Sequence, residues 1–353
     1  MKVTANIQCI PSFFIFPFTC RGLCLLVLLF VLTSCIYEDE TACPIEVRFV
    51  YDRNMEYADA FSSQVDDVTL FIFDEQEVFL KAVHEEGDAL HSDNKMDLDL
   101  LPGVYHLVAW CGLSKDEDGV YIVNHRLVPG VSTIDEAGFK LDCTGRSSWR
   151  HELSNLYHGM VRDFKVAVDA PSQATISLTQ DVNRVKVMLQ RYSATRATVT
   201  DYTVSLKTAN HQLGYDNSVQ PCETLDYRPY DIQAETIENA AGNDSEENTG
   251  TRASGNDLQV VTAELATLRL TPDNETRFIV GTQGGQQLLD IDMVRFIDIM
   301  RLEQYGNMPL QEYLDRENVW HVVLFVSETH NGSPVMVSMK INDWTYVFNH
   351  TDL

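Results

Sequence analysis

Basic residues are scarce in this chain of 353 residues: 26 Lys and Arg stand against 52 Asp and Glu, giving a formal net charge of −26 at pH 7. Such a charge repels nucleic-acid phosphates and anionic lipid headgroups, so we expect no nucleic-acid partner and no basic membrane-binding face. Apolar residues still make up 44 % of the chain, as in globular proteins that bury a core. The length exceeds one ordinary domain and suits two.

The sequence also lacks the short motifs that carry chemistry. It has no GxSxG, HExxH, GxGxxG or P-loop motif and no CxxC pair. Residues 116–119 (DEDG) lack the closing Glu of a calcium loop. Asp97 and Asp99 alternate along one predicted strand, as solvent-exposed residues do. We therefore predict no catalytic residue, no metal site and no cofactor, and a protein that is not an enzyme.

A bilayer-spanning helix is not indicated either, because the apolar run at residues 23–32 (LCLLVLLFVL) is only ten residues long and a span needs about 20. The run follows Arg21 and ends in Leu32-Thr33-Ser34-Cys35, which resembles a bacterial lipobox. We predict that residues 1–34 are a lipoprotein signal peptide and that Cys35 is lipidated. Two or more acyl chains give stable anchoring.

Acidic residues at 38–40 (EDE) follow Cys35 closely and resemble the surface-export signal of Bacteroidia lipoproteins. This resemblance implies a protein held on the outer membrane by its lipid and exposed at the cell surface.

Four cysteines follow Cys35, namely Cys43, Cys111, Cys143 and Cys222. An even number in an oxidising compartment is compatible with two disulfides, and four cysteines allow three pairings. Buried free thiols are an equally good interpretation, and the sequence does not choose between the two.

Short segments of alternating or β-branched residues dominate the rest of the chain. Residues 45–51 (IEVRFVY) alternate, 68–74 and 78–84 predict a hairpin around a polar turn, and 104–111 predicts a central strand. Helical patterns are few and short. Further strands are expected at 164–168, 175–178, 185–190, 202–207, 267–270, 277–281, 288–291, 319–326 and 335–344, and short helices at 293–302 and 310–316. Many short strands separated by turn residues predict an all-β fold of antiparallel sandwiches.

The predicted boundary between two domains lies at Ala170-Pro171-Ser172. It gives an N-terminal sandwich over residues 35–170 and a C-terminal sandwich over 171–353. Residues 231–257 are polar, acidic and poor in aromatics, so we predict an exposed acidic loop within the second domain.

Trp110, Trp149, Trp320 and Trp344 could stack on sugars, but three of them lie in or beside predicted strands, which favours burial in the core. The sequence Tyr157-His158-Gly159 could belong to a ligand site. A tight turn in which the glycine adopts a positive φ is the favoured interpretation.

Several segments together resemble the FimB-like fimbrium anchor family of Bacteroidia. They are residues 47–55 (VRFVYDRNM), 59–61, 68–74, 101–105 with 107–110 (LPGVY, LVAW), 156–159 (LYHG), 310–315 (LQEYLD) and 341–344 (INDW). The resemblance implies two transthyretin-like antiparallel sandwiches with few short helices. It also implies a lipid-anchored structural subunit at the base of a fimbrium, which attaches the filament to the outer membrane and limits its length.

The same resemblance suggests how the subunits join. A sandwich that lacks one strand offers a groove that a neighbour's strand can fill by β-augmentation. We expect the anchor to retain its first strand, 45–51, and to donate a strand from 335–353 to the fimbrial stalk subunit. Arg53 is the nearest cleavable basic residue after the first strand. Two rival hypotheses are a fimbrial tip or accessory adhesin and a glycan-binding surface lipoprotein.

Overall fold

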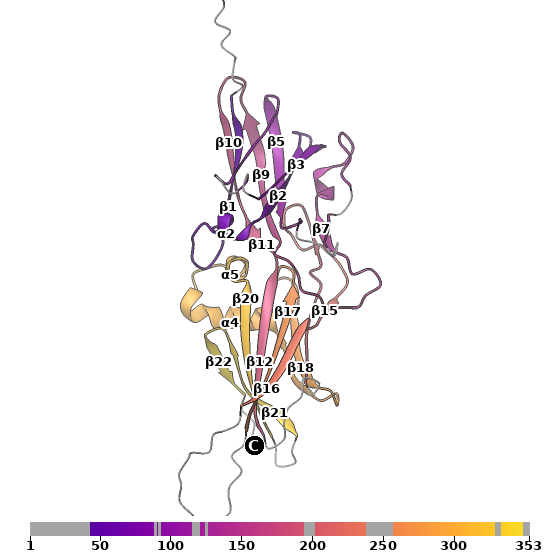
Figure 1. Cartoon of the computed structure of the whole chain (residues 1–353), viewed down its shortest axis with the longest axis vertical. Helices are drawn as coiled ribbons and strands as arrows, with labels where there is room; N and C mark the ends of the chain where they lie inside the picture. Colours follow the sequence, from indigo (N-terminus) through magenta and orange to yellow (C-terminus); the bar gives the residue numbers. More distant parts are fainter. Residues whose placement is uncertain are drawn as a thin grey trace, which may run out of the picture. The chain divides into compact units, whose positions relative to one another are not determined.

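Strands make up most of the described chain and form five sheets among the described residues (Figure 1). The structure is a computed structural model that describes residues 43–87, 90, 93–114, 121–123, 126–193, 202–237, 257–328 and 333–348. Contacts divide the chain into Met1–Pro44 and Ile45–Leu353. The second of these units contains all five sheets.

Two sheets of the N-terminal half face each other across a hydrophobic core. The smaller sheet has the order β10 (Ser172–Ser177), β1 (Ile45–Val50), β4 (Lys95–Asp97). The larger has the order β11 (Thr179–Gln180), β9 (Tyr157–Val166), β5 (Gly103–Cys111), β2 (Asp67–Phe73), β3 (Phe79–Glu86). Val47 and Phe49 from the first sheet and Ile72 and Leu107 from the second belong to one core cluster, so the two sheets form a sandwich.

The C-terminal half repeats this two-sheet arrangement around the larger core cluster. Its six-stranded sheet has the order β16 (Asp231–Ile237), β17 (Asp257–Thr267), β12 (Asn183–Ser193), β20 (Val319–Glu328), β21 (Pro334–Ile341), β22 (Trp344–Val347). Its partner sheet has the order β19 (Gln287–Asp292), β18 (Arg277–Thr282), β13 (Tyr202–Thr208), β15 (Leu225–Tyr227), β8 (Ser148–Trp149). The all-β fold of antiparallel sandwiches that the sequence predicts is confirmed.

The fifth and smallest sheet of the described chain explains why β5 is apolar on both faces. It has the order β14 (Gln212–Leu213), β7 (Phe139–Leu141), β6 (Tyr121–Val123). Trp110 of β5 packs against Phe139 of β7, with ring centroids 5.3 Å apart, whereas its neighbour Ala109 faces the other core cluster. A strand covered on both sides carries an uninterrupted apolar run, and every residue from Tyr105 to Cys111 is buried.

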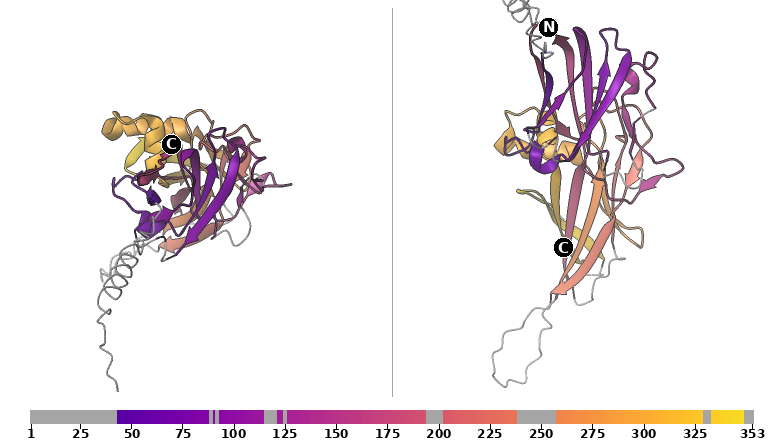
Figure 2. Two further views of the ribbon diagram at one scale, coloured as in Figure 1. Left: turned by 90° about the horizontal axis from the view of Figure 1, so that it is seen from above. Right: turned by 45° about the horizontal axis from the view of Figure 1, so that its top comes forward.

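The few helices of the described chain are short, as predicted. They are α2 (Phe61–Gln64), the 3₁₀ turn η1 (Ile134–Glu136), α4 (Met293–Tyr305) and α5 (Leu310–Arg316). At the start of α4 the Asp292 carboxylate accepts a hydrogen bond from the Arg295 amide at 3.2 Å, an ordinary N-cap. Helices α4 and α5 lie to one side of the sheets in both orientations (Figure 1, Figure 2).

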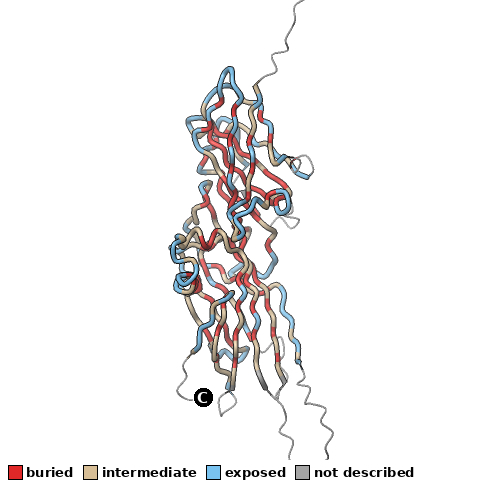
Figure 3. Tube along the Cα trace, turned by 90° about the vertical axis from the view of Figure 1, so that its left-hand side faces the viewer, coloured by how far each residue is buried: buried red, intermediate tan, exposed pale blue. Residues whose placement is uncertain are grey.

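The two halves exchange strands. β8 pairs in parallel with β15, and β14 pairs with β7. β10 and β11, which follow the predicted boundary at 170/171, lie in sheets with β1 and β9. The division into domains over 35–170 and 171–353 stays a prediction. Buried residues run along the strands of both halves and exposed ones gather at the turns (Figure 3).

Three sequence predictions about strands are wrong in part. The strand predicted at 267–270 lies earlier, because β17 covers Asp257–Thr267 and ends where the prediction begins. The loop predicted for 231–257 begins later, because Asp231–Ile237 forms β16 and lies antiparallel to β17; residues 238–256 lie outside the described residues. The polar composition of this segment led to the prediction of a loop. An edge strand is held by backbone hydrogen bonds, however, and polar side chains do not prevent these. The strand predicted at 335–344 is two strands, β21 and β22, because Asn342 turns the chain with a φ of 50°.

The turn predicted at Tyr157-His158-Gly159 is also wrong, since all three residues lie within β9. Gly159 has no positive φ and is needed for space. A Cβ there would lie 2.5 Å from Cγ2 of Ile176 and 2.8 Å from the carbonyl oxygen of Ser177. Close packing of β9 against β10, rather than backbone freedom, therefore requires the glycine.

Candidate functional site

The first strand, β1, occupies the middle of its sheet, and we take this strand with its groove as the first part of the candidate site. Residues 45–50 lie opposite 172–177 of β10 in parallel register, and on the other side 46–48 pair with 95–97 of β4. β1 is therefore hydrogen-bonded along both edges. Its removal would leave two strands with unpaired backbone groups facing each other, which is a strand-accepting groove.

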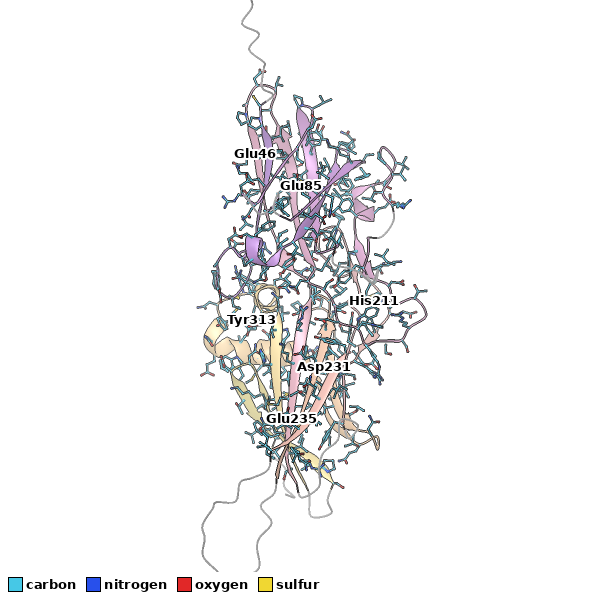
Figure 4. The ribbon with its side chains drawn as sticks, viewed as in Figure 1. Glu46, Glu85, His211, Asp231, Glu235 and Tyr313 are labelled. Atoms are coloured by element: carbon cyan, nitrogen blue, oxygen red, sulfur yellow. The ribbon has the colours of Figure 1, made fainter. Side chains whose placement is uncertain are left out.

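Side chains of β1 alternate between core and solvent, as the sequence predicts. Val47 and Phe49 are fully buried, and Phe49 stacks on Phe61 with a centroid distance of 5.9 Å. On the outer face, the carboxylate of Glu46 accepts a hydrogen bond from Nζ of Lys95 at 2.8 Å, and Figure 4 shows Glu46 on β1. The strand is thus bound by its apolar side chains, its backbone and one ion pair.

The end of β1 is joined to the C-terminal half by a buried polar cluster. The Tyr51 hydroxyl donates to Oε1 of Gln180 at 3.1 Å, and Nδ2 of Asn318 donates to both of these oxygens at 3.2 Å. Burial raises the pKa of Tyr51 to about 12. Because the three residues lie more than a hundred positions apart in the chain, no local sequence pattern predicts this cluster.

The last described strand, β22, forms the second part of the candidate site and lies at the edge of its sheet. Among the described residues only β21 pairs with it, with 344–347 opposite 338–341. Tyr346 and Val347 have exposed fractions of 47 % and 58 %. The Tyr346 ring contacts Phe296 of α4, with centroids 5.8 Å apart. β22 therefore presents an open backbone edge beside exposed apolar side chains.

The other residues that the sequence singled out do not gather into a site. Trp110 and Trp320 are buried, as their predicted strands favoured. Trp149, outside those strands, is buried as well, and Trp344 is only half-buried on β22. His158 is buried against the carbonyl oxygen of Tyr215 at 2.7 Å, and burial lowers its pKa to about 4. These aromatic rings therefore serve packing and offer no broad exposed platform.

The acidic residues that the sequence singled out form no cluster among the described residues. Asp97 and Asp99 are both exposed, as predicted. In the described part of the chain, no group of three His, Cys, Asp or Glu side chains is placed to hold a metal. Residues 116–119, whose acidic sequence lacks the closing Glu of a calcium loop, lie outside the described residues.

The four cysteines after Cys35 are all unbonded thiols in the structure. Cys111 is fully buried in β5, and burial raises the pKa of its thiol well above the usual value. Cys35 lies outside the described residues, so its lipidation stays a prediction. No helix in the described ranges has the length and apolar character needed to cross a bilayer.

Comparison with known proteins identifies the family. The family model of fimbrillin-A associated anchor proteins Mfa1 and Mfa2 matches residues 39–350. The chain belongs to this anchor family. It is thus a fimbrial anchor or accessory protein, and the resemblance drawn from the sequence is confirmed. A search of curated proteins finds no match.

Solved structures of Bacteroides proteins resemble this family member over nearly their whole length. A candidate polysaccharide-binding protein of Bacteroides thetaiotaomicron is 28 % identical, covering 88 % of this chain and 100 % of its own, with a TM-score of 0.71. A candidate adhesin of the same organism is 27 % identical over 88 % and 100 % of the two chains, with a TM-score of 0.72. The Mfa2 anchor protein of Porphyromonas gingivalis is 18 % identical over 87 % and 100 %, with a TM-score of 0.62, and shares the fold. The three are thus described as a candidate polysaccharide-binding protein, a candidate adhesin and a fimbrial anchor protein.

Proposed function

We propose that this protein is the base subunit of a surface fimbrium, held on the outer membrane by lipid at Cys35. It joins the last stalk subunit to the cell and limits the length of the filament. The observation that carries the proposal is β1, which fills the groove of its own sheet from within the same chain. A subunit whose groove is already filled cannot accept a strand, so a filament that reaches it stops growing at that end.

Retention of β1 and anchoring support each other. β1 begins at Ile45, ten residues after Cys35, so the lipid and the strand belong to the same end of the chain. Cleavage after β1 would release the folded body from its lipid. An anchor must therefore keep the strand.

The contact with the stalk subunit is made by strand complementation through the C-terminal stretch 335–353. Within that stretch β21 is enclosed between β20 and β22, whereas β22 is the terminal strand of the described sheet. We therefore assign the contact with the stalk subunit to β22, whose free backbone edge would pair with a strand of that subunit. Pairing there would leave the rest of the six-stranded sheet intact.

A deletion strain tests the anchor role, and a Cys35→Ala strain tests the lipid. Deletion is expected to give longer or shed filaments, because nothing would end growth or hold the base. Cys35→Ala is expected to release the folded protein, with its filaments, from the membrane fraction. Filaments of unchanged length and attachment in the deletion strain would contradict the proposal, and firm membrane retention of Cys35→Ala would contradict the lipid anchor.

The glycan-binding alternative draws on the description of the first Bacteroides neighbour. Sugar-binding sites of that kind need exposed aromatic faces, yet Trp110, Trp149 and Trp320 are at most 1 % exposed. Oligosaccharide binding that is lost on Trp344→Ala would favour this alternative over the anchor.

A further inference from the structure

The segment after β1 folds into a compact loop around the side chain of Asn54. Oδ1 of Asn54 accepts hydrogen bonds from the amides of Glu56 and Ala58 at 3.1 and 3.4 Å. Its Nδ2 donates to the carbonyl oxygens of Tyr51 at 3.1 Å and Ala58 at 2.7 Å. The chain between β1 and α2 is thus tightly turned and hydrogen-bonded to itself.

Arg53 lies in this loop and is exposed to solvent. Its side chain makes a long contact with Thr179, since Nη1 lies 3.5 Å from Oγ1 of that residue. An exposed arginine in a surface loop is the usual target of an arginine-specific endoprotease. Hydrolysis would add water across the Arg53–Asn54 peptide bond, leaving a carboxylate on Arg53 and a free amine on Asn54, and would separate β1 from the rest of the chain.

Arg316, in the last turn of α5, holds the backbone on both sides of Arg53. Its Nη1 donates to the carbonyl oxygen of Asp52 at 3.1 Å and to that of Asn54 at 3.2 Å. Its guanidinium carbon lies 4.2 Å from the centroid of the Tyr57 ring, within cation–π range. Its Nε donates to Glu312 at 3.0 Å, one helical turn earlier, which fixes the direction of the side chain.

We propose that Arg316 is a clamp that keeps the Arg53–Asn54 bond resistant to arginine-specific endoproteases and so preserves β1 as part of the protein. The clamp deepens the proposed function and rests on it for its biological purpose. The Arg316 side chain is only 15 % exposed. Its hydrogen bonds to the two carbonyls are charge-assisted, and the one to Asn54 is partly buried whereas the one to Asp52 is exposed.

Arg316 would act by limiting how often the loop around Arg53 opens. An endoprotease binds several residues on each side of the cleaved bond in an extended form, and the loop would have to leave its turned conformation to fit. When opening is fast relative to cleavage, the cleavage rate follows the population of the open form. The contacts of Arg316 with Asp52, Asn54 and Tyr57 exist only in the closed loop, so their removal raises that population.

Limited proteolysis with trypsin tests the clamp on the full chain purified from membranes in detergent. The fragment that begins at Asn54 is quantified over time by N-terminal sequencing and mass spectrometry. Arg316→Ala is expected to form this fragment about tenfold faster than the wild type, as loss of a charge-assisted hydrogen-bond pair implies. Arg316→Lys keeps the charge but loses the planar contact with Tyr57, so an intermediate rate is expected.

Arg295→Ala is the matched control. It also removes one arginine from a C-terminal helix, but that side chain is 85 % exposed and forms its ion pair with Asp292, at the start of its own helix α4. It should leave the rate of cleavage after Arg53 unchanged. Adding Arg53→Gln to Arg316→Ala should abolish the fragment. Equal rates for Arg316→Ala and the wild type, or equal acceleration by Arg295→Ala, would overturn the clamp.

Should Arg316→Ala fail to fold, Tyr57→Ala carries the test. Tyr57 is 58 % exposed, so its truncation removes the contact with Arg316 without opening the core. Faster cleavage after Arg53 supports the clamp, and an unchanged rate contradicts it. A negative result here leaves the anchor role open to its own test, because filament length in the deletion strain does not depend on Arg53.

Discussion

β1 and β22 lie near opposite ends of the described chain and are held in different ways. β1 has a hydrogen-bonded neighbour on each side and buries Val47 and Phe49 completely. β22 has a neighbour on one side of the described sheet and exposes Tyr346 and Val347. Under the proposed function, the enclosed strand β1 would be retained permanently and the edge strand β22 would contact a second chain. The number of paired edges would then decide which of these two roles a strand takes.

The largest effect is expected from truncating the enclosed strand. Phe49→Ala would remove a fully buried ring that stacks on Phe61, at a cost of about 3–5 kcal/mol in the free energy of unfolding. Chemical denaturation measures this directly.

Val347→Ala is the counterpart on the edge strand and should change the free energy of unfolding by about 0.5 kcal/mol or less, as exposed positions do. Similar losses for Phe49→Ala and Val347→Ala would abolish the contrast between the two strands.

An intermediate effect is expected at Asp181, where the chain passes from β11 to β12. The side chain is fully buried. Burial raises its pKa to about 7, although Arg269 and a hydrogen bond from Asn217 at 2.8 Å oppose the shift. The folded state therefore binds a proton more tightly than the unfolded state. The stability that this provides is fully present below pH 4 and is lost as the pH rises to about 7.

Asp181→Asn should remove this dependence, and the difference between the two proteins isolates it. His158 acts in the opposite direction, because its pKa is lowered to about 4 and its contribution is lost as the pH falls. It is present in both proteins and cancels. Relative to Asp181→Asn, the wild type should lose on the order of 2–4 kcal/mol between about pH 4 and pH 8, measured by denaturation at each pH. A constant difference across this range would contradict a buried, proton-binding Asp181.

Local patterns predicted the strands well because alternation is set by which face each residue presents. The hairpin of β2 and β3 follows from two apolar segments around a polar turn, and the continuous apolar run of β5 marks a strand that is covered on both faces. Edges were harder to predict. β16 is polar and acidic, and only its register with β17 reveals it.

The candidate site depends on contacts that no local pattern contains. β10 pairs with β1 from more than a hundred residues away, and Arg316 reaches Asp52 across 264 positions. Gly159 shows the same limit: its neighbours in sequence suggest a turn, whereas the nearby Ile176 of another strand explains it. The sequence predicted that β1 is a strand that the protein retains. Only the fold shows that β10 and β4 pair with it on either side.

Val347→Pro is the sharpest test of the edge strand, and only a small effect on stability is expected from it. The amide of Phe348 donates to the carbonyl oxygen of Val337 at 2.8 Å. Since successive amides of an antiparallel strand point to opposite sides, the amide of Val347 faces away from β21. Proline there removes a donor that β21 does not use, so the free energy of unfolding should change by about 1 kcal/mol or less.

Tyr346→Pro is the matched control, because the amide of Tyr346 faces β21 and its loss should destabilise the sheet. If a stalk strand pairs with β22, Val347→Pro should release filaments from cells while the protein stays folded on the membrane, and Val347→Ala should not. Imaging of cell-bound and shed filaments distinguishes the variants. If filaments stay attached to cells carrying Val347→Pro, the stalk subunit does not pair with the open edge of β22, and this part of the proposal is wrong.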